Sequence, residues 1–161
     1  MPRNADSFAA AFFRDWRALE AAGSRAERLR AERRRGRSPS EQLDRLIESD
    51  AAEAWTLVLA LVGHAPSEAG LAYVAAGPIE TLLTQHGAEF GDRIVQEAGS
   101  NARFRAALNY VWGWDRVAAS VRNRLLPLLD RDVAAFWGRS DRNAQSPGAE
   151  HWTTARMARR E

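Results

Sequence analysis

Three side chains in the middle of the chain have types that could carry acid–base chemistry: His86, Glu80 and Asp92. An imidazole held by a carboxylate can act as a general base or as a metal ligand near neutral pH. Glu80 and His86 are six positions apart, or about 240° around an α-helix, so they cannot meet on one face. A catalytic pair of His86 with Glu80, Glu89 or Asp92 would therefore need a contribution from a second helix.

His86 also has a structural interpretation, which we favour. The apolar stripe of its predicted helix falls at i, i+3, i+4 and i+7: Ile79, Leu82, Leu83 and His86. Gly87 follows directly and is expected to close the helix, which places His86 in the last turn. A histidine there can cap free carbonyl groups, and the helix dipole favours its charge. An enzyme is accordingly the least expected function.

Neither a metal centre nor a cofactor is expected. The chain has no cysteine, which excludes disulfides, thiolate zinc sites, iron–sulfur clusters and cysteine nucleophiles. His64, in a predicted turn, and His151, near the C-terminus, have no second ligand at metal-binding spacing. A phosphate-binding glycine loop and a serine nucleophile elbow are also missing from the sequence.

Residues 75–87 carry the start and stop signals of one helix. Gly77 is expected to leave the preceding helix, and Pro78 suits the first position of the next, where its missing N–H costs nothing. Glu80 then lies near the third position and can reach back to free N–H groups of the first turn. Gly87 ends this helix.

The rest of the chain predicts further short helices. No segment alternates apolar and β-branched residues as a strand would. Caps and breaks are indicated at Asp6-Ser7, Ser38-Pro39-Ser40, Asp50 with Glu53, Ser67, Gly99-Ser100 and Pro127. We therefore predict an all-α fold, an irregular array of about 7–9 short helices packed as stacked helical hairpins. Trp16, Trp55 and Trp112 are expected in the core, and Trp114, Trp137 and Trp152 near its periphery.

Composition shifts divide the chain into four predicted segments. An N-terminal helix packed on the core is expected in 1–23, and an Arg-rich helical extension or linker in 24–40. The helical core domain is predicted for 41–137, and a flexible polar tail for 138–161. Apolar runs of about 18 residues and a secretory leader are both missing, so we expect no membrane association.

Charge is distributed unevenly along the sequence. Residues 1–40 hold ten Arg and five acidic residues, 41–98 hold two Arg and ten acidic residues, and 99–161 hold eleven Arg and six acidic residues. All 23 basic residues are Arg, a usage typical of a GC-rich bacterial genome. With no cysteine, a cytoplasmic protein is expected. An acidic middle between basic flanks favours docking within the chain or capture of a basic partner, unless the charges are simply solvated helix faces.

The basic segment 25–37 raises a second possibility, nucleic-acid binding. It holds seven arginines: Arg25, Arg28, Arg30, Arg33, Arg34, Arg35 and Arg37. Arginine contacts phosphates and gives salt-sensitive binding. The segment has no aromatic residues on which bases could stack, which argues against single-strand recognition. A solvated extension is the simpler interpretation.

The stretch 46–112 resembles an uncharacterised family of small bacterial helical proteins, a domain of unknown function. The resemblance rests on Asp50, Ala54 and Trp55; on Ala75 to Glu80, Leu82, Leu83, His86 and Gly87; and on Phe90, Asp92, Arg93, Ile94, Phe104, Arg105 and Trp112. The shared string is Ala-Ala-Gly-Pro-Leu/Ile-Glu-x-Leu-Leu-x-x-His-Gly, here with Ile79. Gly91 stands where the family pattern suggests a bulkier apolar residue, which would loosen that helix. The resemblance implies an all-helical fold and no particular reaction.

Taken together, the sequence predicts a non-enzymatic helical module that offers an acidic central surface to a protein partner. The residues expected at that surface are Glu80, Glu89, Asp92 and Arg93. Nucleic-acid binding through 25–37 is the first alternative. An enzyme that uses His86 with an acidic partner is the second.

Overall fold

The computed structural model describes residues 4–22, 24 and 38–140, and every regular element among them is helical. The elements are α1 (Ala5–Glu20), α3 (Pro39–Ser49), α4 (Ala51–His64), α5 (Glu68–Val74), the π-helical η2 (Ala75–Ile79), α6 (Glu80–Ser100), α7 (Ala102–Leu108), the 3₁₀ turn η3 (Trp114–Arg116), α8 (Ala119–Leu125), the 3₁₀ turn η4 (Leu126–Leu128) and α9 (Arg131–Ser140). When α5, η2 and α6 are joined, and α8 with η4, the described residues form seven helices. The predicted all-α fold is confirmed.

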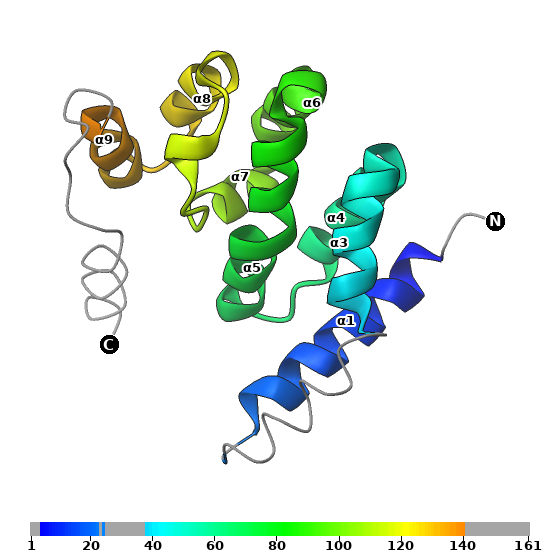
Figure 1. The fold of residues 1–161 in the computed structure, drawn as a ribbon. Coiled ribbons are helices and arrows are strands. Elements are labelled where there is room, and N and C mark those ends of the chain that lie inside the picture. Colours follow the sequence, from blue (N-terminus) through cyan, green and yellow to red (C-terminus); the bar gives the residue numbers. More distant parts are fainter. Residues whose placement is uncertain (1–3, 23, 25–37, 141–161) are drawn as a thin grey trace.

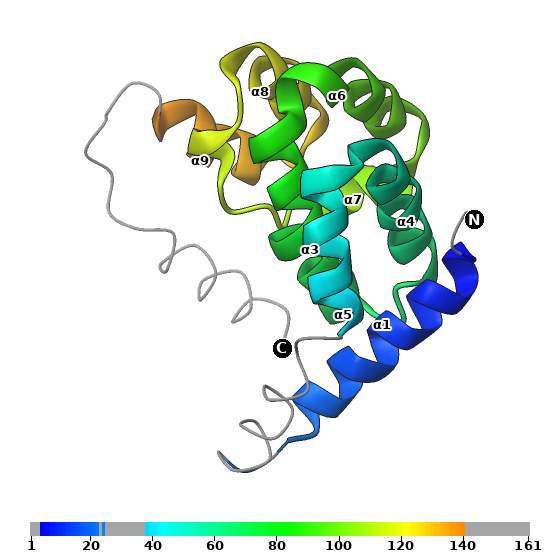
Figure 2. The same ribbon diagram turned by 45° about the vertical axis from the view of Figure 1, so that its right-hand side comes forward.

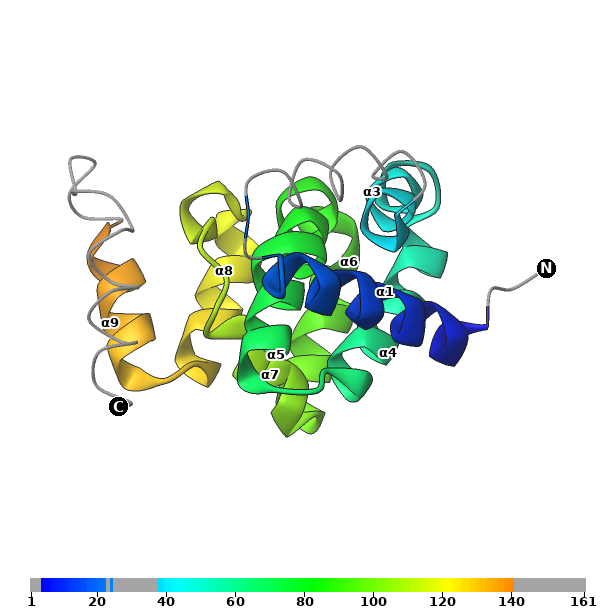
Figure 3. The same cartoon turned by 90° about the horizontal axis from the view of Figure 1, so that it is seen from below.

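The helices follow one another in space in the order of the chain, from α1 at one end to α9 at the other (Figure 1). α3 and α4 lie side by side, and α4 also contacts α5, α6 and α7. α8 packs on α6, and α9 packs on η3 and η4, away from α1 (Figure 2). Seen from below, α1 lies across the array and over α4 (Figure 3).

An aromatic stripe holds α1 on the other helices. Phe8, Phe12, Phe13 and Trp16 are all buried. The Phe12 and Trp16 rings both contact Tyr73 of α5, with centroid separations of 5.7 and 6.3 Å. Burying each such side chain stabilises the fold by about 1.5–3 kcal/mol, so α1 is firmly attached.

The predicted helix break at Gly77-Pro78 is wrong, because α5, η2 and α6 form one continuous helix. Proline lacks an N–H, and in an α-helix its ring collides with the carbonyl four residues earlier. The chain forms the wider π-helical turn around Pro78 instead of breaking. The Thr81 hydroxyl donates to the Gly77 carbonyl at 3.1 Å, so this disturbed turn retains a hydrogen bond.

Gly87 does not end a helix either, since α6 continues to Ser100. Buried Phe90 and Ile94 continue the apolar stripe beyond it. A glycine within a helix costs about 1 kcal/mol relative to alanine, less than the burial of these two side chains gains. His86 therefore lies in the middle of α6, and the predicted position in a last turn, with its capping role, is wrong.

Gly91 lies at a close approach between α6 and α8. A Cβ added there would lie 2.6 Å from the Val121 Cγ2. The absent side chain lets α8 pack against α6. The predicted loosening is not observed, because α6 is helical through this position.

Most predicted helix starts are confirmed by their capping bonds. Ser38, Asp50 and Ser67 each accept the backbone N–H three residues later, at 3.3, 3.0 and 3.1 Å. α1 begins earlier than predicted, because Asn4 caps it by accepting the N–H groups of Asp6 and Ser7 at 3.1 Å each. An asparagine side chain at this position satisfies two donors that the helix itself leaves free.

Two tryptophans exchange their predicted roles. Trp112 is 45% exposed, whereas Trp114 is fully buried. α7 ends at Leu108, so Trp112 lies beyond the helix and is not carried into the core by it. Trp16 and Trp55 are buried as predicted. The Trp137 side chain and Trp152 lie outside the described residues.

The predicted segment boundaries remain predictions. Within 1–23, α1 packs on α3 and α4. Residues 25–37 of the predicted Arg-rich segment lie outside the described residues, and so does the predicted tail beyond Ser140.

Candidate functional site

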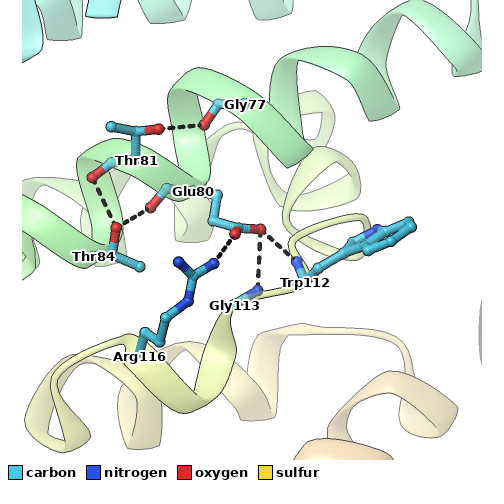
Figure 4. Close-up of polar contacts among 7 residues, drawn as sticks. All are labelled: Gly77, Glu80, Thr81, Thr84, Trp112, Gly113 and Arg116. Atoms are coloured by element: carbon cyan, nitrogen blue, oxygen red, sulfur yellow. Dashed lines mark hydrogen bonds and ion pairs between the residues drawn. The ribbon is translucent and has the colours of Figure 1, made fainter. Parts of the chain in front are cut away.

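Glu80 ties the start of α6 to a loop that follows 32 residues later in the chain. Its Oε2 accepts the backbone N–H groups of Trp112 at 2.9 Å and Gly113 at 3.0 Å. Its Oε1 pairs with the guanidinium of Arg116 (Figure 4). Only 13% of the Glu80 side chain is exposed. Hydrogen bonds to an ionised carboxylate are about twice as strong as neutral ones, so this contact fixes the loop.

This contact differs from the role that the sequence predicts for Glu80. The helix is continuous, so the turn at Glu80 has no free N–H groups to cap. Gly113 fits the arrangement because a Cβ there would lie 2.8 Å from the Glu80 Oε1. The Trp112 ring points away from the carboxylate (Figure 4). The Glu80 carboxylate is thus used inside the protein.

His86 has no hydrogen bond to a carboxylate in the described part of the chain. Its Nδ1 lies 3.8 Å from the Glu89 Oε2, beyond hydrogen-bond distance. Its ring meets Phe90 edge-on, with centroids 6.4 Å apart. Glu80 and Asp92 bind other residues. Of the three predicted acidic partners, Glu89 is thus the one that lies within ion-pair distance of His86.

The other predicted surface residues lie on the exposed side of α6. Asp92 is 89% exposed and accepts a hydrogen bond from Arg124 of α8 at 2.6 Å. The Arg93 guanidinium lies 5.5 Å from the centroid of the Phe90 ring. Glu89 is 75% exposed. Neighbouring groups of the same protein already contact this set.

A groove lies between α3, α1 and the junction of α5 with η2, and we call it the α3 groove. Its volume is about 370 Å³. The lining includes Phe12, Tyr73, Ala76 and Pro78 on the apolar side and Glu41 and Asp44 on the acidic side. Tyr73 is 37% exposed, although the rings of α1 support it. The groove thus combines an aromatic wall with a carboxylate wall.

The carboxylates of α3 form a row at helical spacing: Glu41, Asp44 and Glu48. Partial burial, together with repulsion from Glu41 and Glu48, raises the pKa of the Asp44 carboxyl above its ordinary value. Glu41 has an exposed ion pair with Arg45 at 3.5 Å. No basic side chain among residues 38–140 pairs with Asp44 or Glu48.

Sequence reasoning did not single out these α3 residues. Their spacing was visible, but an acidic row on an amphipathic helix is usually a solvated face. The exposure of Tyr73 depends on how α1 and α3 pack beside α5, and no signal in the sequence gives it.

A second, larger groove of about 520 Å³ lies between α5, α7 and η4. Its two arginines are used as helix caps. Arg103 donates from Nε to the Val62 carbonyl at 2.6 Å and also binds the Ala65 carbonyl, at the end of α4. Arg105 donates to the Ala98 carbonyl at 2.8 Å, near the end of α6. These contacts are structural, because they satisfy carbonyl groups that helix ends leave free.

The described residues show neither a metal-binding cluster nor a membrane-spanning helix. They contain no group of three or more His, Cys, Asp or Glu side chains placed to hold a metal ion. None of their helices combines the length and apolar character needed to cross a membrane.

Comparison with known proteins gives one match. A family model, described as a family of unknown function (DUF6869), matches residues 34–133, which is more than half of the chain. The match begins after α1, so it covers α3 to η4 and the first residues of α9. None of the curated proteins and none of the solved structures matches the chain.

Proposed function

Because the chain belongs to DUF6869, a family of unknown function, we propose its function from its geometry. It is a non-enzymatic helical interaction module that binds a positively charged segment of a protein partner at the α3 groove. The observation that carries this proposal is that an aromatic wall and a carboxylate wall, formed by Glu41 and Asp44, meet in one concave surface. Grooves that combine an aromatic anchor with a charged rim are typical of protein recognition.

The acidic wall is the first support. Asp44 is partly desolvated and lies near two other carboxylates, which destabilises its charged form in the free protein. A cation bound in the groove would relieve that repulsion, which favours binding. Among residues 38–140, no basic side chain pairs with Asp44.

The exposed side of α6 is less suited to bind a partner than the α3 groove. Asp92 already has Arg124 as a partner, and Arg93 already covers Phe90. A partner that bound there would first have to displace these contacts. Glu89, Asp92 and Arg93 remain the second candidate surface, and the same experiment tests them.

The predicted alternatives have weaker support. Nucleic-acid binding would use Arg residues of 25–37, which lie outside the described residues, and the acidic wall of the α3 groove would repel phosphates. An enzyme would need a carboxylate or other partner at His86, and the nearest carboxylate oxygen, on Glu89, is 3.8 Å away.

The test is a comparison of two matched double variants of the full chain. Glu41→Gln with Asp44→Asn removes the two charges that line the α3 groove, and Glu89→Gln with Asp92→Asn removes two from α6. Wild type and both variants are immobilised and exposed to nuclease-treated lysate of the source cells, and bound proteins are measured by quantitative mass spectrometry. Far-UV circular dichroism confirms that each variant is folded.

We expect one protein that wild type and the α6 variant retain equally and that the α3 variant loses by about tenfold, the effect of about 1.4 kcal/mol. The captured protein must carry a basic segment, and a peptide of that segment must compete for binding. Equal capture by the α3 variant overturns the proposal. If only the α6 variant loses the captured protein, the binding surface lies on α6 and not in the α3 groove. If only nuclease-sensitive material is recovered, the result supports nucleic-acid binding through the Arg-rich segment 25–37.

A further inference from the structure

Two carboxylates and one aromatic ring line the α3 groove together. Glu41 and Asp44 are three positions apart on α3, so their side chains project from the same face. Tyr73 lines the same groove from α5. Its ring packs against the Phe12 ring at an interplanar angle of 50° and against Trp16 at 33°. These contacts hold the Tyr73 ring in place before any ligand arrives, which lowers the entropic cost of binding.

We propose that the α3 groove selects an arginine side chain of the partner over a lysine. The proposal rests on the proposed function, because it specifies which cation enters the same groove. A guanidinium is planar, carries five N–H donors, and can bind carboxylates while its face lies on an aromatic ring. An ammonium is a compact, strongly hydrated charge, and the apolar side of the groove offers it no replacement for lost water.

The protein uses the same chemistry elsewhere on its surface. The Arg45 guanidinium lies 3.5 Å from the Glu41 carboxylate at the rim of the groove. Arg45 is 65% exposed, and an exposed ion pair of this kind contributes about 0–1 kcal/mol. On α6, the Arg93 guanidinium lies over the Phe90 ring. The groove brings both kinds of contact, carboxylate and aromatic, to one place.

The test titrates the full chain with three fluorescent peptides that differ only in one central pair of residues. The pair is arginine, lysine or citrulline, a neutral analogue with nearly the same shape as arginine, and glycine and serine flank it. Fluorescence anisotropy at low salt gives each Kd. The proteins are wild type, the α3 double variant, the α6 double variant, Tyr73→Phe and Tyr73→Leu.

We expect the arginine peptide to bind about tenfold more tightly than the lysine peptide, and the citrulline peptide not to bind. Tyr73→Phe keeps the aromatic face and should keep this preference. Tyr73→Leu should lower the affinity for the arginine peptide to that for the lysine peptide. If Tyr73→Leu fails to fold, an unchanged preference in Tyr73→Phe, together with its loss in the α3 variant, supports the same conclusion. The α6 variant should bind as wild type does.

Equal affinity for arginine and lysine peptides, with both lost in the α3 variant, overturns the arginine preference and leaves the proposed function standing. A preference that survives Tyr73→Leu in a folded protein also overturns the assignment to Tyr73. Binding of neither basic peptide, or binding that the α3 variant does not weaken, overturns both the preference and the groove as the docking site.

Discussion

The Glu80 carboxylate accepts the backbone N–H of Gly113 at 3.0 Å across 33 positions of sequence. The contact joins the turn that follows the π-helical segment to the loop between α7 and η3 (Figure 4). Trp114, next in that loop, is fully buried, and Arg116 closes the contact from the other side. The string Gly-Pro-Ile-Glu, the part of the sequence with the clearest local signals, thus serves to assemble the fold.

Replacing Glu80 should destabilise the protein strongly. Glu80→Gln removes the charge that receives two backbone N–H groups and the Arg116 guanidinium, and a hydrogen bond to a charged group contributes about 1.5–3 kcal/mol. We expect the free energy of unfolding to fall by about 2 kcal/mol in urea denaturation. Glu89→Gln, a carboxylate that is 75% exposed, is the control and should change it by less than about 0.5 kcal/mol. Equal stability of the two variants would contradict the assigned role.

Two glycines of α6 should respond to alanine in opposite directions. At Gly91 a Cβ would lie 2.6 Å from the Val121 Cγ2, so Gly91→Ala should cost about 1–3 kcal/mol by overpacking. At Gly87 a Cβ would meet no atom within 4 Å, so Gly87→Ala should stabilise by about 0.5–1 kcal/mol. Thermal unfolding measures both. Combining Gly91→Ala with Val121→Ala should relieve the overpacking, so the double variant should lose less stability than the sum of the two single variants. If the two losses simply add, the close approach is contradicted.

Neutralising Asp44 should stabilise the free protein while weakening partner binding. Partial burial and two nearby carboxylates raise its pKa in the folded state, so ionisation at neutral pH costs folding free energy. The free energy of unfolding should therefore increase as the pH falls below the raised pKa of folded Asp44. This increase should end near pH 3.8, the ordinary pKa of an aspartate, where the carboxyl is protonated in the unfolded chain as well.

Asp44→Asn removes that penalty. We expect a gain of a few tenths of a kcal/mol at pH 7, kept small because solvent screens the site, and no gain below the ordinary pKa. Denaturation of wild type and variant at several pH values tests this, with Asp92→Asn as the comparison. A variant less stable than wild type at pH 7 would show that the Asp44 carboxylate has a favourable partner.

Two arginines that donate to different kinds of acceptor should differ in their effect on stability. Arg103 binds the carbonyls of Val62 and Ala65 where α4 ends, so Arg103→Ala leaves those acceptors without donors and should cost about 1–2 kcal/mol. Arg124 pairs with a highly exposed Asp92, so Arg124→Ala should cost at most about 1 kcal/mol. Raising salt should reduce the second effect more than the first. A larger loss for Arg124→Ala would reverse this assignment.

Local signals predicted the helical class, three capping residues and the end of α6, because each depends on a few adjacent residues. They failed at Pro78 and Gly87, where a local preference for breaking competes with the burial of an apolar stripe. Burial gains several kcal/mol over the stripe, whereas a single glycine costs about 1 kcal/mol. Such competition is resolved only by the partner helices.

The candidate site was less predictable than the fold. The sequence singled out Glu80 but not its partners. These are Trp112, Gly113 and Arg116, which lie 32, 33 and 36 positions later in the chain. Asp44 and Tyr73 were not singled out, since an acidic residue or a tyrosine on a helix looks the same whether it faces bulk water or a groove. His86 was placed in a last turn that does not exist.

The sequence by itself determined that the chain is helical and where most helices begin, because capping and periodicity act over one or two turns. Only the tertiary structure decided that Gly77-Pro78 becomes a π-helical turn, that Trp114 is buried while Trp112 is exposed, and that carboxylates of α3 meet Tyr73 of α5. These outcomes depend on contacts between elements far apart in the chain. Their free energy comes from surface that is buried only when the whole array is assembled.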